Sequence, residues 1–77
     1  MKFFFHVRDI GGFEPDLEGL ELPCLADAIE EARKVAREMI AELVLHGHRV
    51  DGRAFLIADE RGVILRAVVF KDILGLD

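Results

Sequence analysis

The sequence predicts an α+β domain in two layers, with one helix packed on an antiparallel sheet in the order ββαββ. An alternating aromatic segment opens the chain, a long segment with helical periodicity fills its middle, and two strand-like segments around a short turn close it. Because 77 residues can bury only one sizeable core, we expect residues 1–77 to form a single domain.

The first strand is expected from Lys2 to Arg8, where side chains alternate between two faces. One face would carry Phe3, Phe5 and Val7, and the other would carry Phe4, His6 and Arg8. A glycine pair at 11–12 then marks a turn. A weaker second strand is expected from residue 13 to about residue 22, at an edge of the sheet or irregular, because proline and glycine interrupt it.

A helix is expected after Pro23, ending near His46 and Gly47. Apolar residues recur there at three- and four-residue spacing and form one stripe. The stripe consists of Leu25, Ala28, Ile29, Ala32, Val35, Ala36, Met39, Ile40 and Leu43. Cys24 holds the expected N-cap position, although its side chain caps a helix less well than Ser, Thr, Asp or Asn.

The last third of the chain predicts a hairpin, with strands at residues 53–58 and 63–70. If Gly62 adopts the left-handed conformation of a three-residue loop, Asp59 pairs with Val63. The face toward the helix would then hold Phe55, Ile57, Val63, Leu65, Ala67 and Val69. The opposite face would hold Ala54, Leu56, Ala58, Ile64, Arg66, Val68 and Phe70. A loop of two or four residues would exchange the first-strand residues between these faces.

The face away from the helix is therefore expected to carry many apolar side chains that one helix cannot cover. We interpret it as the interface of a homodimer or of a complex with another protein, since large exposed apolar patches mark such sites. The candidate interface residues are Phe4, His6, Arg8, Leu56, Ile64, Arg66, Val68 and Phe70. The alternative is that the tail from Asp72 to Asp77 folds back over this face.

Composition restricts the class of partner. The formal net charge of −5 argues against direct nucleic-acid binding, and no apolar run is long enough to span a membrane. A single cysteine, Cys24, cannot form an internal disulfide, and a cytoplasmic location is the expectation. Acidic residues concentrate between Asp9 and Glu21, so a basic protein is a possible partner.

Residues with catalytic or metal-binding chemistry are few. His6 and Arg8 share a strand face and could bind an anion, but their spacing brings no nucleophile or paired carboxylate beside them. His46 and His48, with Cys24 or His6, have the residue types of a metal site without its full ligand spacing. We expect Cys24 to be a small buried hydrophobe, and we expect no cofactor and no enzymatic activity.

Two motifs carry a resemblance to known families. The segment from Phe4 to Asp9, followed by Glu18–Pro23, resembles a family of small bacterial proteins known only as a domain of unknown function. The run from Gly11 to Ala32 is more distantly similar to the first half of HicB-type antitoxins, which implies binding to a small basic toxin. The closing hairpin departs from the antitoxin pattern.

Three functions are consistent with these features. The leading hypothesis is a non-enzymatic protein-interaction module that forms a homodimer through its sheet. The first alternative is a HicB-like antitoxin or regulatory partner that binds a small basic protein through residues 9–21. The second alternative is a small-ligand or metal-binding enzyme that uses His6, Arg8, His46 and His48.

Overall fold

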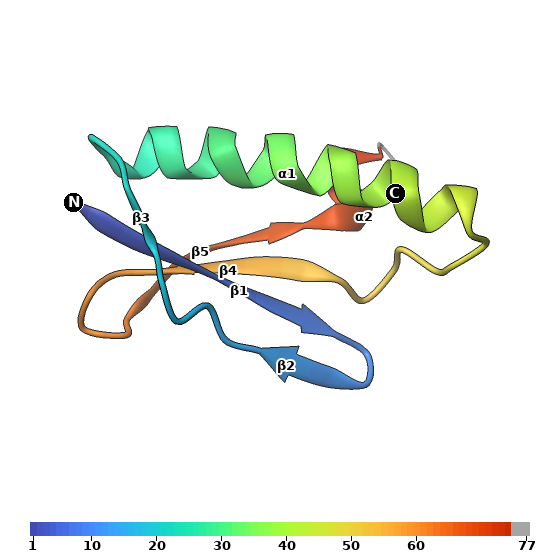
Figure 1. The fold of residues 1–77 in the computed structure, drawn as a ribbon, viewed down its shortest axis with the longest axis horizontal. Coiled ribbons are helices and arrows are strands. Elements are labelled where there is room, and N and C mark those ends of the chain that lie inside the picture. The colour runs from blue at the N-terminus through green and yellow to red at the C-terminus, as the bar shows by residue number, and fades with distance from the viewer. Residues whose placement is uncertain (75–77) are drawn as a thin grey trace.

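The computed structural model describes residues 1–74 and confirms the α+β fold (Figure 1). Its elements are β1 (Lys2–Asp9), β2 (Gly12–Glu14), β3 (Leu20–Glu21), α1 (Leu25–Leu45), β4 (Ala54–Ala58), β5 (Ile64–Val69) and α2 (Phe70–Ile73). The strands form an antiparallel sheet in the order β2-β1-β4-β5, and β3 pairs with the start of β1. The expected ββαββ order therefore holds, with the second strand divided and a short helix added.

The second strand is divided because residues 15–19 do not pair along β1. Gly19 has a φ of +75°, and a Cβ at this position would lie 2.9 Å from the Phe4 ring and 3.1 Å from the Phe3 carbonyl oxygen. Only glycine fits both the left-handed backbone and this close approach. The chain thus leaves β1 after Glu14, passes beside the Phe4 ring and returns to pair at Leu20.

Helix α1 presents the predicted apolar stripe to the sheet. Ala28, Ala32 and Ala36 have almost no exposed surface, and Ile40 is also buried. The small alanine side chains let the helix backbone lie close to the strands. The helix begins after Cys24, whose backbone is extended and whose side chain makes no capping hydrogen bond, and it ends before Gly47 at a φ of +73°.

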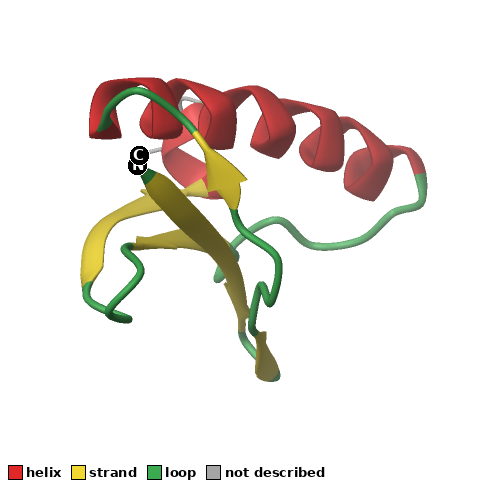
Figure 2. Ribbon diagram, turned by 60° about the vertical axis from the view of Figure 1, so that its left-hand side comes forward, coloured by secondary structure: helices red, strands yellow, loops and turns green. Residues whose placement is uncertain are grey.

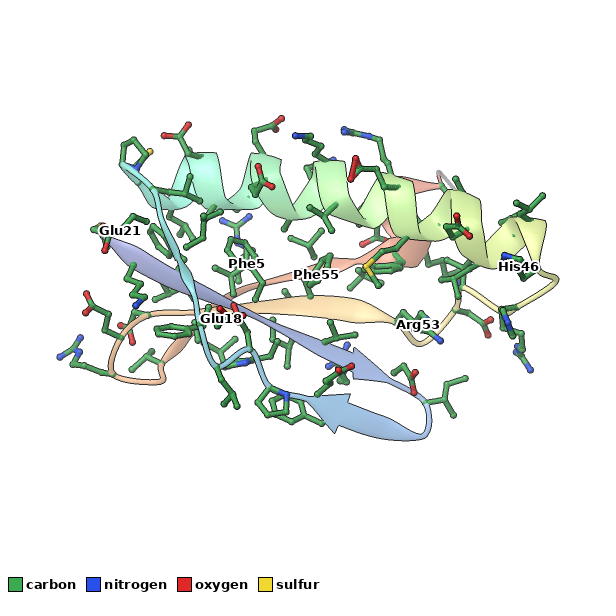
Figure 3. The ribbon with its side chains drawn as sticks, in the orientation of Figure 1. Phe5, Glu18, Glu21, His46, Arg53 and Phe55 are labelled. Atoms are coloured by element: carbon green, nitrogen blue, oxygen red, sulfur yellow. The ribbon has the colours of Figure 1, made fainter. Side chains whose placement is uncertain are left out.

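Aromatic side chains fill the space between α1 and the sheet. Phe3 and Phe70 are fully buried, and the Phe70 ring lies 5.4 Å from that of Phe55. The rings of Phe5 and Phe55 meet edge to face at 6.4 Å, and both lie between α1 and the strands (Figure 3). These contacts join the first and last thirds of the chain in one core.

The hairpin has the predicted loop but a different register beyond it. Gly62 has a φ of +83°, and the Asp59 N–H donates to the Val63 carbonyl as expected. However, Ala58 pairs with Ile64 while Ile57 pairs with Arg66, so Leu65 is an extra residue in β5. Such a bulge exchanges the two faces for every following residue.

The bulge makes part of the interface prediction wrong. Val68 and Phe70 were expected on the face away from the helix, but both are buried in the core beneath α1. Arg66 pairs with the buried Ile57 and therefore also lies on the helix side of the sheet. Ala67 and Val69 take the opposite face instead, since they pair with Leu56 and Ala54.

Both helices lie on one side of the sheet (Figure 2). Helix α2 contacts α1 and β5, and Ile73 packs against the core. The described part of the tail therefore does not cover the opposite face, and the expected contribution of Leu76 lies outside the described residues. Neither of the two helices in residues 1–74 combines the length and apolar composition needed to cross a bilayer.

Candidate functional site

The sheet face opposite α1 is the candidate functional site, and we call it the outer face. Strand pairing builds it from three rows of side chains across β1, β4 and β5. The rows are Phe4, Ala58 and Ile64; His6, Leu56 and Ala67; and Arg8, Ala54 and Val69. The structure thus brings together five of the eight predicted residues, namely Phe4, His6, Arg8, Leu56 and Ile64.

One residue outside the predicted set extends this apolar surface. Phe13 pairs with Arg8, its ring lies 5.5 Å from that of His6, and it is 57% exposed. Leu17, in the loop between β2 and β3, is 86% exposed. Spacing alone does not predict these positions, because the path of the chain beside β1 depends on side-chain hydrogen bonds.

Asp16 provides those hydrogen bonds. Its Oδ2 accepts from the Phe5 N–H at 3.0 Å, and its Oδ1 accepts from the N–H groups of Glu18 and Gly19. The Asp16 N–H in turn donates to Nδ1 of His6 at 2.9 Å. Asp16 therefore replaces the missing strand partner of Phe5 and holds the loop against β1.

These contacts set the charge state of Asp16. Partial burial acts to raise its pKa, but the three N–H donors and the nearby His6 outweigh burial, so the pKa is lowered from its ordinary value. His6 accepts at Nδ1, so in this structure the proton of a neutral imidazole is on Nε2. The predicted anion-binding role of His6 would therefore depend on its Nε2–H, because Nδ1 is already an acceptor.

Asp16→Ala is expected to destabilise the fold by about 1–2 kcal/mol, because it leaves the partly buried Phe5 N–H without an acceptor. The folded pKa is lowered, so the contribution of Asp16 is complete above its unfolded pKa of about 3.9 and is lost as the pH falls through the folded pKa. Urea unfolding at pH 7 and pH 3 should therefore show a smaller difference between the variant and the wild type at pH 3. Glu18→Ala is the control, and an equal loss in both variants would contradict this role.

Cations lie at both ends of β1 on the outer face. The Lys2 ammonium is 5.9 Å from the centroid of the Phe4 ring, and Arg8 is exposed at the other end. Ala54 and Ala58, between them on β4, are fully buried beneath their larger neighbours. The outer face is thus apolar at its centre and positively charged at its ends.

The predicted acidic segment is partly neutralised. Asp9 lies 3.5 Å from Arg53, Glu21 lies 3.3 Å from the N-terminal ammonium, and Asp16 is hydrogen-bonded within the loop. Within residues 1–74, Glu14 and Glu18 make no ion pair. Fewer acidic groups are therefore available to a basic partner than the sequence suggested.

The structure keeps His46 and His48 close, with ring centroids 6.4 Å apart, but separates them from Cys24. Cys24 and His46 flank the 21-residue α1, which places them roughly 30 Å apart. His46 lies 3.2 Å from Glu42 at the far end of the molecule from Glu18 and Glu21 (Figure 3). In the described part of the chain, no three His, Cys, Asp or Glu residues could together hold a metal ion. The expectation that Cys24 is buried is wrong, because it is exposed.

A small hollow of about 180 Å³ at the end of the sheet also contains charged groups. It is lined by Asp9, Ile10, His48, Arg49, Asp51 and Arg53. Arg49 donates to Asp51 at 2.7 Å and lowers the pKa of that carboxyl group, while Arg53 faces Asp9. Both arginines of this hollow therefore already have carboxylate partners within residues 1–74.

The comparisons with known proteins identify one family. A family model described as a domain of unknown function, DUF6894, matches residues 2–71. No curated protein and no solved structure matches the chain.

Proposed function

We propose that this chain, which belongs to the DUF6894 family, is a non-enzymatic protein-interaction module that forms a homodimer through its outer face. The observation that supports this proposal is the position of both helices on one side of the sheet, which leaves Phe13 and Ile64 exposed on the other. Together with Phe4 and Leu56 they form an apolar surface of the kind that usually marks an interface.

The charges around the outer face favour a second copy as its occupant. Arg8 lies at one end of β1, and Glu18 lies in the loop that passes Phe4 near the other end. If two outer faces pack about a twofold axis with their β1 strands antiparallel, Arg8 of each copy meets the end of the other that carries Lys2, and Glu18 in the neighbouring loop can offset these two cations. A twofold interface must be complementary to itself in this way.

Two other functions have weaker support. A HicB-like role toward a basic protein would rely on the acidic segment, where Glu14 and Glu18 are the residues without an ion pair in the described chain. An enzymatic role would rely on His6, whose Nδ1 already accepts a hydrogen bond, and on Arg8. Neither function uses the exposed apolar side chains of the outer face.

Light scattering coupled to size exclusion tests the homodimer. At micromolar concentration we expect a mass of twice 8.7 kDa, and we expect Phe13→Glu to reduce the measured mass to that of one chain. A buried charge without a partner costs several kcal/mol at an interface, which is sufficient to dissociate a micromolar dimer.

Leu45→Glu is the matched control, because Leu45 is 76% exposed but lies at the end of α1, away from the outer face. It should leave the dimer intact. A wild-type chain that is monomeric at these concentrations, or a dimer that Phe13→Glu does not weaken, would contradict the proposal.

A further inference from the structure

We propose that the free edge of β5 binds an extended acidic peptide, which adds a strand to the sheet. Strand β5 is last in the order β2-β1-β4-β5, and its described pairing is with β4 alone. The other edge of such a strand presents backbone N–H and C=O groups at the spacing of a β-ladder. Extended peptides bind to edges of this kind through main-chain hydrogen bonds, while pockets for alternate side chains select the sequence.

A groove runs beside this edge and gives it selectivity. It has a volume of about 190 Å³ and lies between β5 and the two helices. Ile29 and Arg33 of α1, residues 66–69 of β5, and Asp72 and Ile73 of α2 line it. Figure 1 shows β5 beneath α1 and continuing directly into α2. A strand added to β5 would therefore have one row of side chains directed into this groove.

The groove carries a net positive charge in a chain whose formal net charge is −5. Arg33 and Arg66 are both exposed, and neither makes an ion pair among residues 1–74, whereas Asp72 contributes one opposing charge. Arg66 lies on the helix side of the sheet because it pairs with the buried Ile57. Two guanidinium groups thus lie beside the same row of side chains of an added strand. Guanidinium groups bind carboxylates in preference to other side chains.

The other row of the added strand would meet apolar groups. Ala67 and Val69 lie on the outer face of β5, as does Ile64, which is 48% exposed. Since strand side chains alternate between faces, the preferred peptide alternates acidic and apolar residues. The bulge at Leu65 and the start of α2 at Phe70 leave residues 66–69 regular, so about four peptide residues would fill the edge.

This site borders the proposed dimer interface at Ile64, Ala67 and Val69, but its backbone edge and its two arginines, Arg33 and Arg66, lie outside the outer face. If the peptide did not bind, the homodimer proposal would stand, and if the chain were monomeric, the peptide-binding proposal would stand. The homodimer is measured by mass, whereas the edge site is measured by peptide binding.

The test is a titration of the isotope-labelled full chain with a blocked peptide that alternates glutamate and valine, followed by amide chemical shifts. We expect saturable shifts at residues 64–69 and at Arg33, with affinity that falls as salt is added. Arg66→Glu and Arg33→Glu should each weaken binding roughly tenfold, since reversal of a contacting charge replaces attraction with repulsion. The same peptide with lysine in place of glutamate should not bind.

Arg37→Glu is the matched control, because Arg37 is also exposed on α1 but does not line the groove. The Arg37→Glu variant should bind the glutamate peptide with the affinity of the wild type. Absence of saturable shifts, equal affinity in Arg66→Glu and wild type, or shifts confined to His6 and Leu56 on the outer face would each overturn the proposal.

Discussion

Phe70→Ala is expected to lower the free energy of unfolding by about 3–5 kcal/mol, the usual cost of removing a buried phenyl ring. Phe70 is fully buried, its ring contacts that of Phe55, and its N–H donates to the Arg53 carbonyl at 3.0 Å. The ring therefore fixes the junction of β5 and α2 against the start of β4. A domain of this size has a total stability of only about 4–12 kcal/mol, so the variant should be close to unfolding at room temperature.

Urea unfolding followed by circular dichroism measures this effect, with Phe13→Ala as the matched control. Phe13→Ala removes the same ring, but Phe13 is 57% exposed on the outer face. The substitution should therefore lower the free energy of unfolding by less than about 1 kcal/mol. At low protein concentration self-association does not contribute to the measured free energy of unfolding. Equal losses in the two variants would contradict the observed register of β5 and favour the register without a bulge.

Sequence periodicity was sufficient for the elements whose stability comes from a repeated apolar pattern. Helix α1 has the predicted stripe, and β1 and β4 have the predicted alternation because each places large side chains on the core side. Asp59 and Gly62 also predicted the hairpin loop, since a left-handed glycine at that position fixes its geometry. In these segments local preference and core burial favour the same structure.

The errors arose where one residue changed the register or where a side chain replaced a strand. Leu65 and Arg66 could each continue an alternating strand, so the sequence pattern does not locate the bulge. The bulge forms because it lets Val68 and Phe70 be buried in the core. Asp16 is an ordinary turn residue in the sequence, and its role depends on the Phe5 N–H of a strand eleven residues earlier. Three of the eight candidate interface residues were therefore placed on the wrong face, and the contribution of the loop to the outer face was missed.

Ala36→Leu is expected to destabilise the fold by about 1–3 kcal/mol through overpacking, because no exposed surface remains at this position. Ala36 lies in the middle of α1, where the helix backbone lies close to the sheet and a longer side chain must displace either the helix or the aromatic residues beneath it. Helix propensity cannot explain such a loss, since leucine is nearly as good a helix former as alanine.

Two further alanines of α1 separate overpacking from other causes. Ala41 is exposed, so Ala41→Leu should change the free energy of unfolding by less than about 0.5 kcal/mol. Ala32 is buried, but it lines a hollow of about 150 Å³ together with Phe5, Val35 and Phe55, so Ala32→Leu can place its added carbons there. We therefore expect a smaller loss for Ala32→Leu than for Ala36→Leu in urea unfolding. If Ala36→Leu were as stable as Ala41→Leu, the close contact between α1 and the sheet would be contradicted. The explanation that α1 carries three buried alanines because its backbone lies close to the sheet would then also be wrong.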